Sequence, residues 1–361
     1  MPTVIKTSED RPAGTKTHHQ PDGTFVNPWP SFKSGDASFL RVLWNWERER
    51  SKPPPESERL AVRKPDFEKI QQFYHGKIQG NFLLTWIGHA AMLITVPRMH
   101  ILFDPCLSDR CSPSQLVGPK RITPPACQIE DLPPVDVVVI SHNHYDHLDK
   151  NTILALAKSP QTYFFVPLGC KKWFTDLEIK NVVECDWWDE YKYTVERDIE
   201  TSVSVAATPC QHFSGRSLWD RNHTLWASWV LVSKNAKFFF GGDTGLRTVP
   251  ENFEGDLATL PTCPAFNEIG EKYGPFNLSA IPIGAYSPRW FMSRVHCDPS
   301  DAVLVHKMVK SQKSVGMHFG TFILTDEPVN EPPKKLKEEA KAAGLAEDEF
   351  ITIEIGESIV V

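Results

Sequence analysis

The chain has 361 residues, of which 41% are hydrophobic and 23% charged, a balance that excludes a disordered protein and allows a sizeable core. Its 39 basic and 45 acidic residues give a net charge of −6, which argues against a dedicated nucleic-acid-binding protein. No apolar run approaches the roughly 20 residues that cross a bilayer, and the N-terminus lacks the apolar core of a signal peptide. The eight cysteines form no CxxC pair, and we expect reduced thiols. We therefore expect an intracellular protein whose membrane contact is peripheral.

Residues 1–24 are polar and rich in turn-forming residues, so we expect a flexible N-terminal arm before a single domain at 25–361. Helical spacing of apolar residues predicts helices at Phe39–Glu49 and Pro65–Tyr74. The proline run Pro53–Pro55 between them forbids one continuous helix.

From residue 82 onward, short apolar runs bounded by glycine and proline predict strands, and amphipathic segments between them predict helices. The predicted strands are Phe82–Ile87, Ala91–Val96, Ile101–Phe103, Val135–Ile140, Tyr163–Val166, Ser202–Ala207, Thr224–Val232, Lys237–Phe240, Ser279–Ile283, Ser314–His318 and Phe350–Ile355. The predicted helices are Thr152–Lys158, Phe266–Tyr273, Ala302–Val309 and Pro332–Ala343. This alternation predicts a layered α/β fold.

The sharpest motif, Ser-His-Asn-His-Tyr-Asp-His-Leu-Asp at 141–149, directly follows the strand Val135–Ile140. That strand is apolar throughout and should be buried on both faces. Loops at the carboxyl ends of such strands carry the ligand sites of α/β sheets. In a loop, His142 and His144 can point to one side and Asp146 and His147 to the other, so one segment can serve two metal ions. Imidazole and carboxylate ligands suit zinc, and iron or manganese are possible.

Three more ligand-type residues each follow a predicted strand: His212, Asp243 and His318. Each is weak as a signal by itself, because single histidines at strand ends usually have structural roles. Together with the motif they predict a complete site. Asp243 stands between Gly242 and Gly245, which leave it room to bridge two metals.

The HxHxDH motif with downstream His, Asp and His resembles the metallo-β-lactamase superfamily. Further segments resemble the N-acylphosphatidylethanolamine-hydrolysing phospholipase D family, and they extend from about residue 25 to the C-terminus. These segments are Phe25–Pro30, Gly118–Arg121, Asp186–Trp188, Gly274–Phe276, Ile281–Tyr286, Pro288–Met292 and His318 with Gly320–Phe322.

The resemblance implies an α/β fold, the metallo-β-lactamase αββα sandwich of two mixed β-sheets flanked by helices. It also implies two Zn²⁺ ions per chain. By motif position His142, His144 and His212 would hold one zinc, Asp146, His147 and His318 would hold the other, and Asp243 would bridge them.

The implied activity is that of a zinc-dependent phosphodiesterase of phospholipase D type. A metal-bridging hydroxide would hydrolyse N-acylphosphatidylethanolamine to N-acylethanolamine and phosphatidic acid. The implied partners are a membrane phospholipid substrate and a second copy of the chain in a homodimer, with no nucleic acid. The expected location is on cytoplasmic-facing endomembranes or partly in solution, with mitochondria left open.

Several residues should support this chemistry. We expect catalytic roles for Asp146, Asp243 and His296, the last being a family position whose alternative role is the entry to the following helix. Asp104 and His89 should orient metal ligands, while Asp149 is a candidate helix cap.

A lipid phosphate needs a nearby cation and an apolar surface, and candidate substrate-binding residues are Tyr145, Arg216, Trp219 and Leu116. Arg216, four residues after His212, is predicted to reach a phosphate oxygen. Additional candidates are Val117 and Trp173-Phe174 for the apolar surface and Lys120 and Arg121 for anionic headgroups.

Residues 247–262 resemble an insertion that begins four residues after Asp243, where it can reshape the rim of the site or act as a lid.

An alternative function keeps the metal site but makes the protein a lactonase or amidase acting on a small amphiphile. A lipid- or steroid-binding module with a vestigial site is a third hypothesis, which the complete ligand set disfavours. A nuclease of the same superfamily is disfavoured by the acidic net charge.

Overall fold

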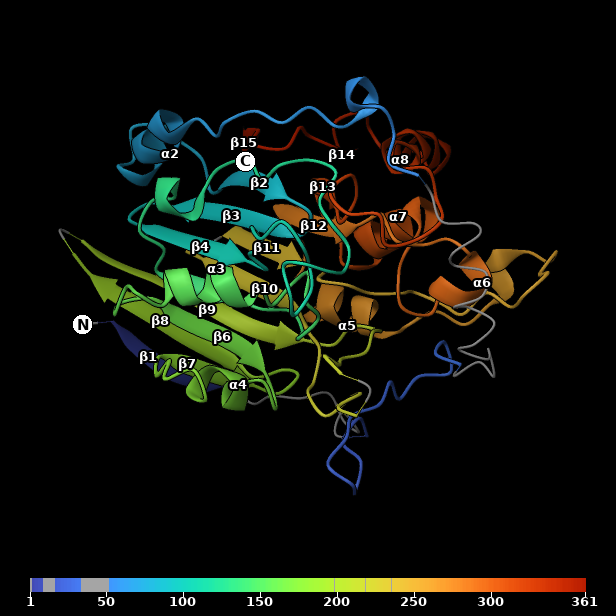
Figure 1. Cartoon of the computed structure of the whole chain (residues 1–361), viewed down its shortest axis with the longest axis horizontal. Coiled ribbons are helices and arrows are strands. Elements are labelled where there is room, and N and C mark those ends of the chain that lie inside the picture. Colours follow the sequence, from blue (N-terminus) through green and yellow to red (C-terminus); the bar gives the residue numbers. More distant parts are fainter. Residues whose placement is uncertain (1, 9–16, 34–51, 198, 218, 235) are drawn as a thin grey trace.

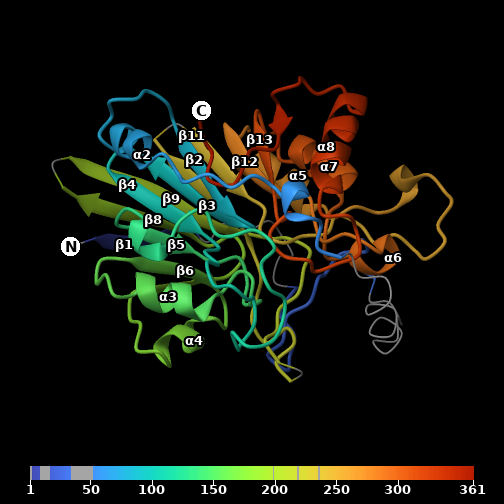
Figure 2. The ribbon, with the colours of Figure 1, turned by 45° about the horizontal axis from the view of Figure 1, so that its top comes forward.

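Two mixed β-sheets lie face to face, with helices on their outer faces (Figures 1 and 2). The computed structural model describes residues 2–8, 17–33, 52–197, 199–217, 219–234 and 236–361. The helix predicted at Phe39–Glu49 falls outside these residues. Among the described residues, no helix is both long enough and apolar enough to cross a bilayer. All eight cysteines are buried free thiols.

The first sheet has the strand order β15-β2-β3-β4-β5-β6-β7. Its strands are β2 (Leu83–Gly88), β3 (Ala91–Val96), β4 (Met99–Phe103), β5 (Val137–Val139), β6 (Tyr163–Pro167), β7 (Val182–Cys185) and β15 (Ser358–Val360). The strands β15, β2, β3 and β4 are antiparallel, and β4 to β7 are parallel. Every residue of β2 to β5 is buried, as expected for apolar strands covered on both faces.

The second sheet has the order β1-β8-β9-β10-β11-β12-β13-β14. Its strands are β1 (Thr3–Ser8), β8 (Glu190–Glu196), β9 (Glu200–Thr208), β10 (Ser228–Ser233), β11 (Ala236–Phe240), β12 (Leu278–Pro282), β13 (Ser314–Met317) and β14 (Phe350–Ile351). The strands from β1 to β11 pair antiparallel, and β11 to β14 are parallel.

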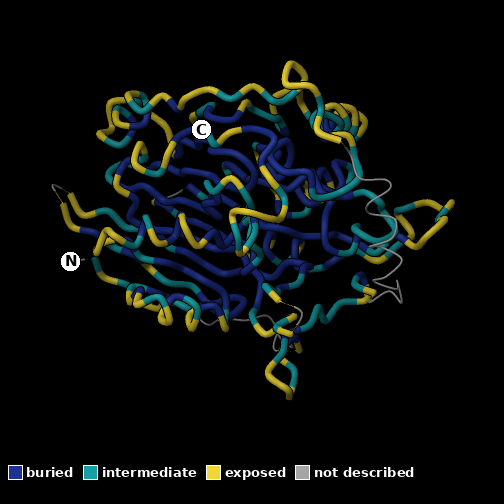
Figure 3. The backbone as a smooth tube through the Cα atoms, in the orientation of Figure 1, coloured by how far each residue is buried: buried dark blue, intermediate teal, exposed yellow. Residues whose placement is uncertain are grey.

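The core lies between the sheets, where the buried backbone is concentrated (Figure 3). The ring of Phe103 on β4 lies 5.3 Å from that of Phe238 and 4.8 Å from that of Phe240, both on β11. The indole of Trp229 on β10 donates a hydrogen bond to the carbonyl of Ile140 at 3.0 Å. Aromatic packing therefore joins β4 to β11, the strand that precedes Asp243, and the hydrogen bond joins β10 to the residue just before the metal motif.

Seven α-helices and three 3₁₀ segments are described: α2 (Phe67–Tyr74), α3 (Lys150–Leu156), α4 (Lys171–Thr175), α5 (Ala265–Lys272), α6 (Arg289–Met292), α7 (Pro299–Met308), α8 (Glu331–Ala342), η1 (Glu56–Glu58), η2 (Ile129–Asp131) and η3 (Leu257–Thr259). Helices α2 and α4 contact β3 and β7 of the first sheet, and α7 and α8 contact β12 and β14 of the second. The predicted αββα layering is confirmed.

The expectation of a flexible arm over residues 1–24 is wrong where the structure describes that segment. Residues 3–8 form β1, which pairs antiparallel with β8 at the edge of the second sheet. Further along, His18 Nε2 and His19 Nε2 lie 2.8 and 3.0 Å from the two carboxylate oxygens of Asp186. The His18 ring also stacks on Trp187 at 4.1 Å. The polar composition misled the prediction because these partners are distant in sequence.

The 247–262 segment is anchored at its start. Arg247 Nε lies 2.9 Å from Asp301 Oδ1 on α7, and both side chains are buried. The Val249 amide donates to Ser293 Oγ at 2.8 Å. The segment then projects beside α6 (Figure 1), and none of its residues lines the large cavity described below. Its action as a lid stays a prediction.

Candidate metal centre

The loop after β5 brings four ligand-type side chains to the edge where the two sheets meet. Helix α3 fixes the end of this loop, because the side chain of Asp149 accepts from the Asn151 amide and caps the helix as predicted. Asp149 also accepts hydrogen bonds from the Ser108 amide and hydroxyl at 3.0 and 2.8 Å. The remaining candidate ligands follow β9, β11 and β13 and are His212, Asp243 and His318.

His142, His144, His212 and Asp243 form the first group of converging donor atoms. His142 Nε2 lies 2.7 Å from His144 Nδ1, which lies 3.3 Å from His212 Nε2. Asp243 Oδ2 lies 3.8 Å from His142 Nε2 and 3.7 Å from His212 Nε2. Three imidazoles and one carboxylate thus face a common point, which is a zinc-type donor set.

Asp146, His147 and His318 form the second group, together with His89. Asp146 Oδ2 lies 3.3 Å from His147 Nε2 and 3.4 Å from His318 Nε2. Asp243 reaches this group as well, with Oδ2 at 3.1 Å from His147 Nε2 and Oδ1 at 3.0 Å from His318 Nε2. The Asp243 carboxylate therefore touches both groups, in the position of a bridging ligand.

Glycines give Asp243 its position. Gly242 has φ +58°, and a Cβ there would lie 2.7 Å from the Cβ of Ser141 and 3.1 Å from the carbonyl of Ala227. A larger residue would therefore collide with the start of the metal loop. The turn after β11 needs glycine at 242 to bring the carboxylate against the histidines.

The electrostatics of the site favour bound positive charge. Although burial favours the neutral imidazole, Asp243 and Asp146 raise the pKa of His147, and Asp243 and Asp146 raise the pKa of His318 to about 9. Asp243 Oδ1 accepts no hydrogen bond despite its short distance to His318, so these atoms point to a common centre more than to each other. Two ionised carboxylates among five imidazoles fit a pair of divalent cations.

Asp104 orients the metal loop. Its Oδ1 accepts from the Ser141 amide at 2.7 Å, and its Oδ2 accepts from Ser141 Oγ at 2.5 Å and lies 2.7 Å from His147 Nδ1. Ligating histidines commonly donate their second ring nitrogen to such a carboxylate. His89 Nε2 lies 2.9 Å from Asp146 Oδ2. The structure thus brings both residues predicted to support ligands into contact with ligands.

A model of the β-lactamase superfamily domain matches residues 99–319. N-acyl-phosphatidylethanolamine-hydrolyzing phospholipase D 1 of Caenorhabditis elegans is 39% identical over 287 residues, which cover 77% of this chain and 76% of that protein. The chain belongs to the N-acylphosphatidylethanolamine-hydrolysing phospholipase D family. It is a metal-dependent hydrolase with the metallo-β-lactamase fold.

A further relative agrees with the family assignment, and a solved structure agrees with the fold. The mitochondrial N-acyl-phosphatidylethanolamine-hydrolyzing phospholipase D of Saccharomyces cerevisiae is 34% identical over 263 residues, covering 72% of this chain and 52% of that protein. A possible metal-dependent hydrolase from Veillonella parvula has the same fold, with a TM-score of 0.57 and 17% identity over 78% of this chain and 100% of that one.

This family member carries a cavity of about 440 Å³ that reaches the candidate metal ligands His144, Asp146 and Asp243. The lining is mainly apolar and aromatic and comes from the loops after β9 and around α6: Phe213, Pro288, Trp290, Phe291, Met292 and Val295, with Arg221 and Arg294. His296 also lines the cavity, and its Nε2 lies 4.0 Å from Asp243 Oδ2. An apolar cavity that ends at a polar centre suits an amphiphilic ligand.

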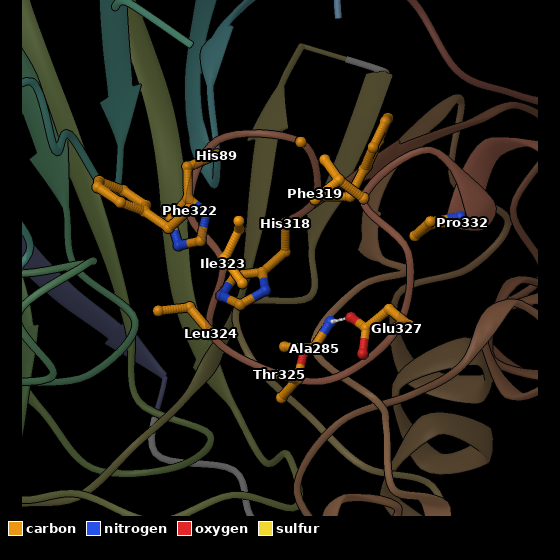
Figure 4. A pocket seen from close by; sticks show the side chains of 12 residues that line it. His89, Ala285, His318, Phe319, Phe322, Ile323, Leu324, Thr325, Glu327 and Pro332 are labelled. Carbon is orange, nitrogen blue, oxygen red and sulfur yellow. Dashed lines mark hydrogen bonds between the residues drawn. The ribbon is translucent and has the colours of Figure 1, made fainter. Parts of the chain in front are cut away.

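A second cavity of about 20 Å³, room for one water, lies beside His318. Figure 4 shows His89 and His318 at this cavity, with Glu327 Oε1 accepting from the Ala285 amide at 2.6 Å. The Nδ1 atoms of His89 and His318 are buried and have no partner among the described residues. This small cavity therefore adjoins His89 and His318 of the second ligand group.

Arg216 has a different role from the predicted phosphate contact. Its Nη1 donates to the carbonyls of Asn143 and Leu148, both at 2.8 Å, and its guanidinium stacks 3.9 Å from the Tyr145 ring centre. The Tyr145 hydroxyl donates back to the Arg216 carbonyl at 2.9 Å. Arg216 and Tyr145 therefore clamp the metal loop together, and neither lines the large cavity.

The remaining predicted surface residues divide into exposed and structural ones. Leu116 and Trp219 are 86% and 87% exposed, as a membrane-contacting role requires. Phe174 is a core residue. Arg121 is buried and donates to the carbonyls of Cys106 and Ser108, so the prediction of a headgroup contact is wrong for it.

Sequence reasoning missed most residues that line the cavity. Trp290, Phe291 and Met292 lie in the segment Pro288–Met292, whose resemblance to the family could have pointed to a role at the site. Arg221 and Arg294 carried no signal, because isolated arginines in loops are usually solvated.

Proposed function

We propose that this protein is a dizinc phosphodiesterase of phospholipase D type that hydrolyses N-acylphosphatidylethanolamine to N-acylethanolamine and phosphatidic acid. The observation that carries the proposal is the single Asp243 carboxylate shared by two ligand groups at the end of an apolar cavity. The name of the C. elegans relative supports this substrate.

The proposed zinc ions would be held by His142, His144 and His212 in one group and by Asp146, His147 and His318 in the other. When bound, two such ions acidify water and polarise the oxygens of a phosphodiester. The chain supplies the geometry: Asp104 orients His147, His89 contacts Asp146, and the Arg216 clamp closes the loop. These contacts fix the ligands before substrate arrives, which lowers the cost of reorganisation.

His296 is the proposed substrate-contacting histidine. Its side chain lines the cavity, and its buried Nδ1 has no protein partner in the described chain. A side chain that lines a cavity and still has a polar atom without a protein partner is suited to bind a substrate oxygen. We assign it a hydrogen bond to the phosphodiester or its leaving oxygen.

The test is to incubate the zinc-loaded protein with vesicles of N-acylphosphatidylethanolamine and to identify the products by mass spectrometry. We expect phosphatidic acid and N-acylethanolamine, and a loss of at least about 10³-fold in rate for His142→Ala. Intact lipid with two bound metals would refute the phospholipase D assignment and direct the search to lactones and amides. Full activity and metal content in His142→Ala would refute the ligand assignment.

We also propose peripheral membrane binding through two exposed loops. One carries Leu116 and contributes Pro119 to the cavity lining, and the other carries Trp219 and contributes Arg221. Leu116→Ser with Trp219→Ser should reduce co-sedimentation with lipid vesicles several-fold, whereas Ile5→Ser, 62% exposed on edge strand β1, should not. An equal loss of vesicle binding in the double variant and in Ile5→Ser would contradict membrane binding through these two loops. The homodimer stays a prediction.

A further inference from the structure

Two arginines, Arg221 and Arg294, line the cavity that reaches the candidate metal ligands. The Arg221 guanidinium lies 4.7 Å from the centre of the Phe213 ring, and that of Arg294 lies 5.1 Å from the centre of the Phe291 ring. Within the described chain, neither guanidinium forms a hydrogen bond or an ion pair with another side chain. Burial and the positive charge of Arg221 lower the pKa of Arg294, because the two cations repel each other.

The other arginines near the site have polar partners within the described chain. Arg216 and Arg121 donate to backbone carbonyls, and Arg247 and Arg289 pair with Asp301. Arg221 and Arg294 differ because each guanidinium lies against an aromatic ring and both residues line the cavity.

Among the described residues, no carboxylate forms an ion pair with Arg221 or Arg294. Asp146 and Asp243, which also line the cavity, belong to the candidate ligand groups. Two like charges held together without a counter-charge are costly unless an anion joins them. The cavity is therefore shaped for a ligand with both an anionic group and an apolar chain.

N-acylation changes the charge of the lipid in the way that this pair would detect. Phosphatidylethanolamine carries a phosphodiester anion and an ammonium cation, whereas the N-acylated lipid carries an amide in place of the ammonium and is a net anion. We propose that Arg221 and Arg294 form a charge filter that binds the anionic N-acylated phospholipid and rejects zwitterionic phospholipids. This inference rests on the proposed substrate class, and rejection by like charge is a common source of specificity.

Binding tests the charge filter without any turnover. Phosphatidylcholine vesicles that contain either N-acylphosphatidylethanolamine or phosphatidylethanolamine are sedimented with the full-length protein. We expect the wild type to prefer the N-acylated lipid by about tenfold and Arg221→Gln with Arg294→Gln to lose most of this preference. Arg294→Lys, which keeps the charge, should retain part of it. The exposed Arg63, paired with Glu354, supplies the control Arg63→Gln, which should behave like the wild type.

A double variant that keeps the wild-type preference would overturn the charge filter. Turnover separates this failure from failure of the proposed function. Release of N-acylethanolamine with unchanged preference in the double variant refutes the filter alone. An arginine-dependent binding preference without any release refutes the phospholipase D assignment and leaves the filter standing. If the charge filter is right and the protein hydrolyses the lipid, the double variant should show mainly a raised KM for N-acylphosphatidylethanolamine.

Discussion

Asp104 acts at the scale of a single residue by fixing both ends of a short ligand segment. It sits at the end of β4 with φ +40° and holds Ser141 before the first ligand and His147, the last ligand of the loop. Sequence spacing shows only that Asp104 follows a strand, because its partners Ser141 and His147 lie 37 and 43 residues further along the chain. The seven ligand-type residues were easier to predict, since four of them share one motif.

Replacing Asp104 with alanine should weaken metal binding by roughly 10–100-fold, because His147 loses the acceptor that orients its ring. Competition with a chromophoric chelator measures this affinity. The exposed Asp348 offers a matched control, since Asp348→Ala removes a carboxylate distant from the metal loop. Wild-type affinity in the Asp104 variant would contradict the orienting role.

At the scale of elements, the sequence predicted the strands that carry the candidate ligands and missed β1, β7, β8 and β15, three of which are edge strands. Runs such as Val137–Val139 are apolar because both faces are covered. Strand β8 was missed because charged residues alternate along it and its pairing with β1 and β9 is non-local. Arg216 was misassigned for a similar reason, since the carbonyls that it binds lie about 70 residues earlier in the chain.

The Arg216 clamp predicts a stability effect that a phosphate ligand would not produce. Arg216→Gln leaves the carbonyls of Asn143 and Leu148 without their donor and should lower the free energy of unfolding by about 2 kcal/mol. Urea denaturation measures this change, and Arg216→Lys should restore part of it. Unchanged stability with a raised KM would instead return Arg216 to its predicted role at the phosphate.

At the scale of the whole molecule, the two stacked sheets bury titratable groups far from the metal centre. His100 on β4 is enclosed by Thr95, with Oγ1 3.0 Å from its Nδ1, and by the ring of Tyr74 at 4.8 Å. Burial, then the nearby Arg197 and His75, lower the pKa of His100 to about 3. The folded protein therefore holds this imidazole neutral.

This histidine should make the protein less stable in mild acid. An unfolded histidine titrates near 6.5, so below that pH the unfolded chain binds a proton that the folded chain excludes, and stability falls until pH reaches the folded value. The contribution at pH 5.5 is a loss of about 1.4 kcal/mol. Urea unfolding of the wild type and His100→Gln at pH 7.5 and 5.5 should show a smaller decline in the variant. An equal decline in both would contradict this account.

The N-terminal strand has a consequence for any shortened form of the protein. A chain that begins at residue 25 lacks β1, so the backbone of β8 becomes an unpaired edge, and Trp187 loses the ring of His18 that stacks on it. Exposed edges of this kind add strands from other molecules. We therefore expect such a truncated enzyme to self-associate and precipitate, although every residue of its catalytic centre is still present.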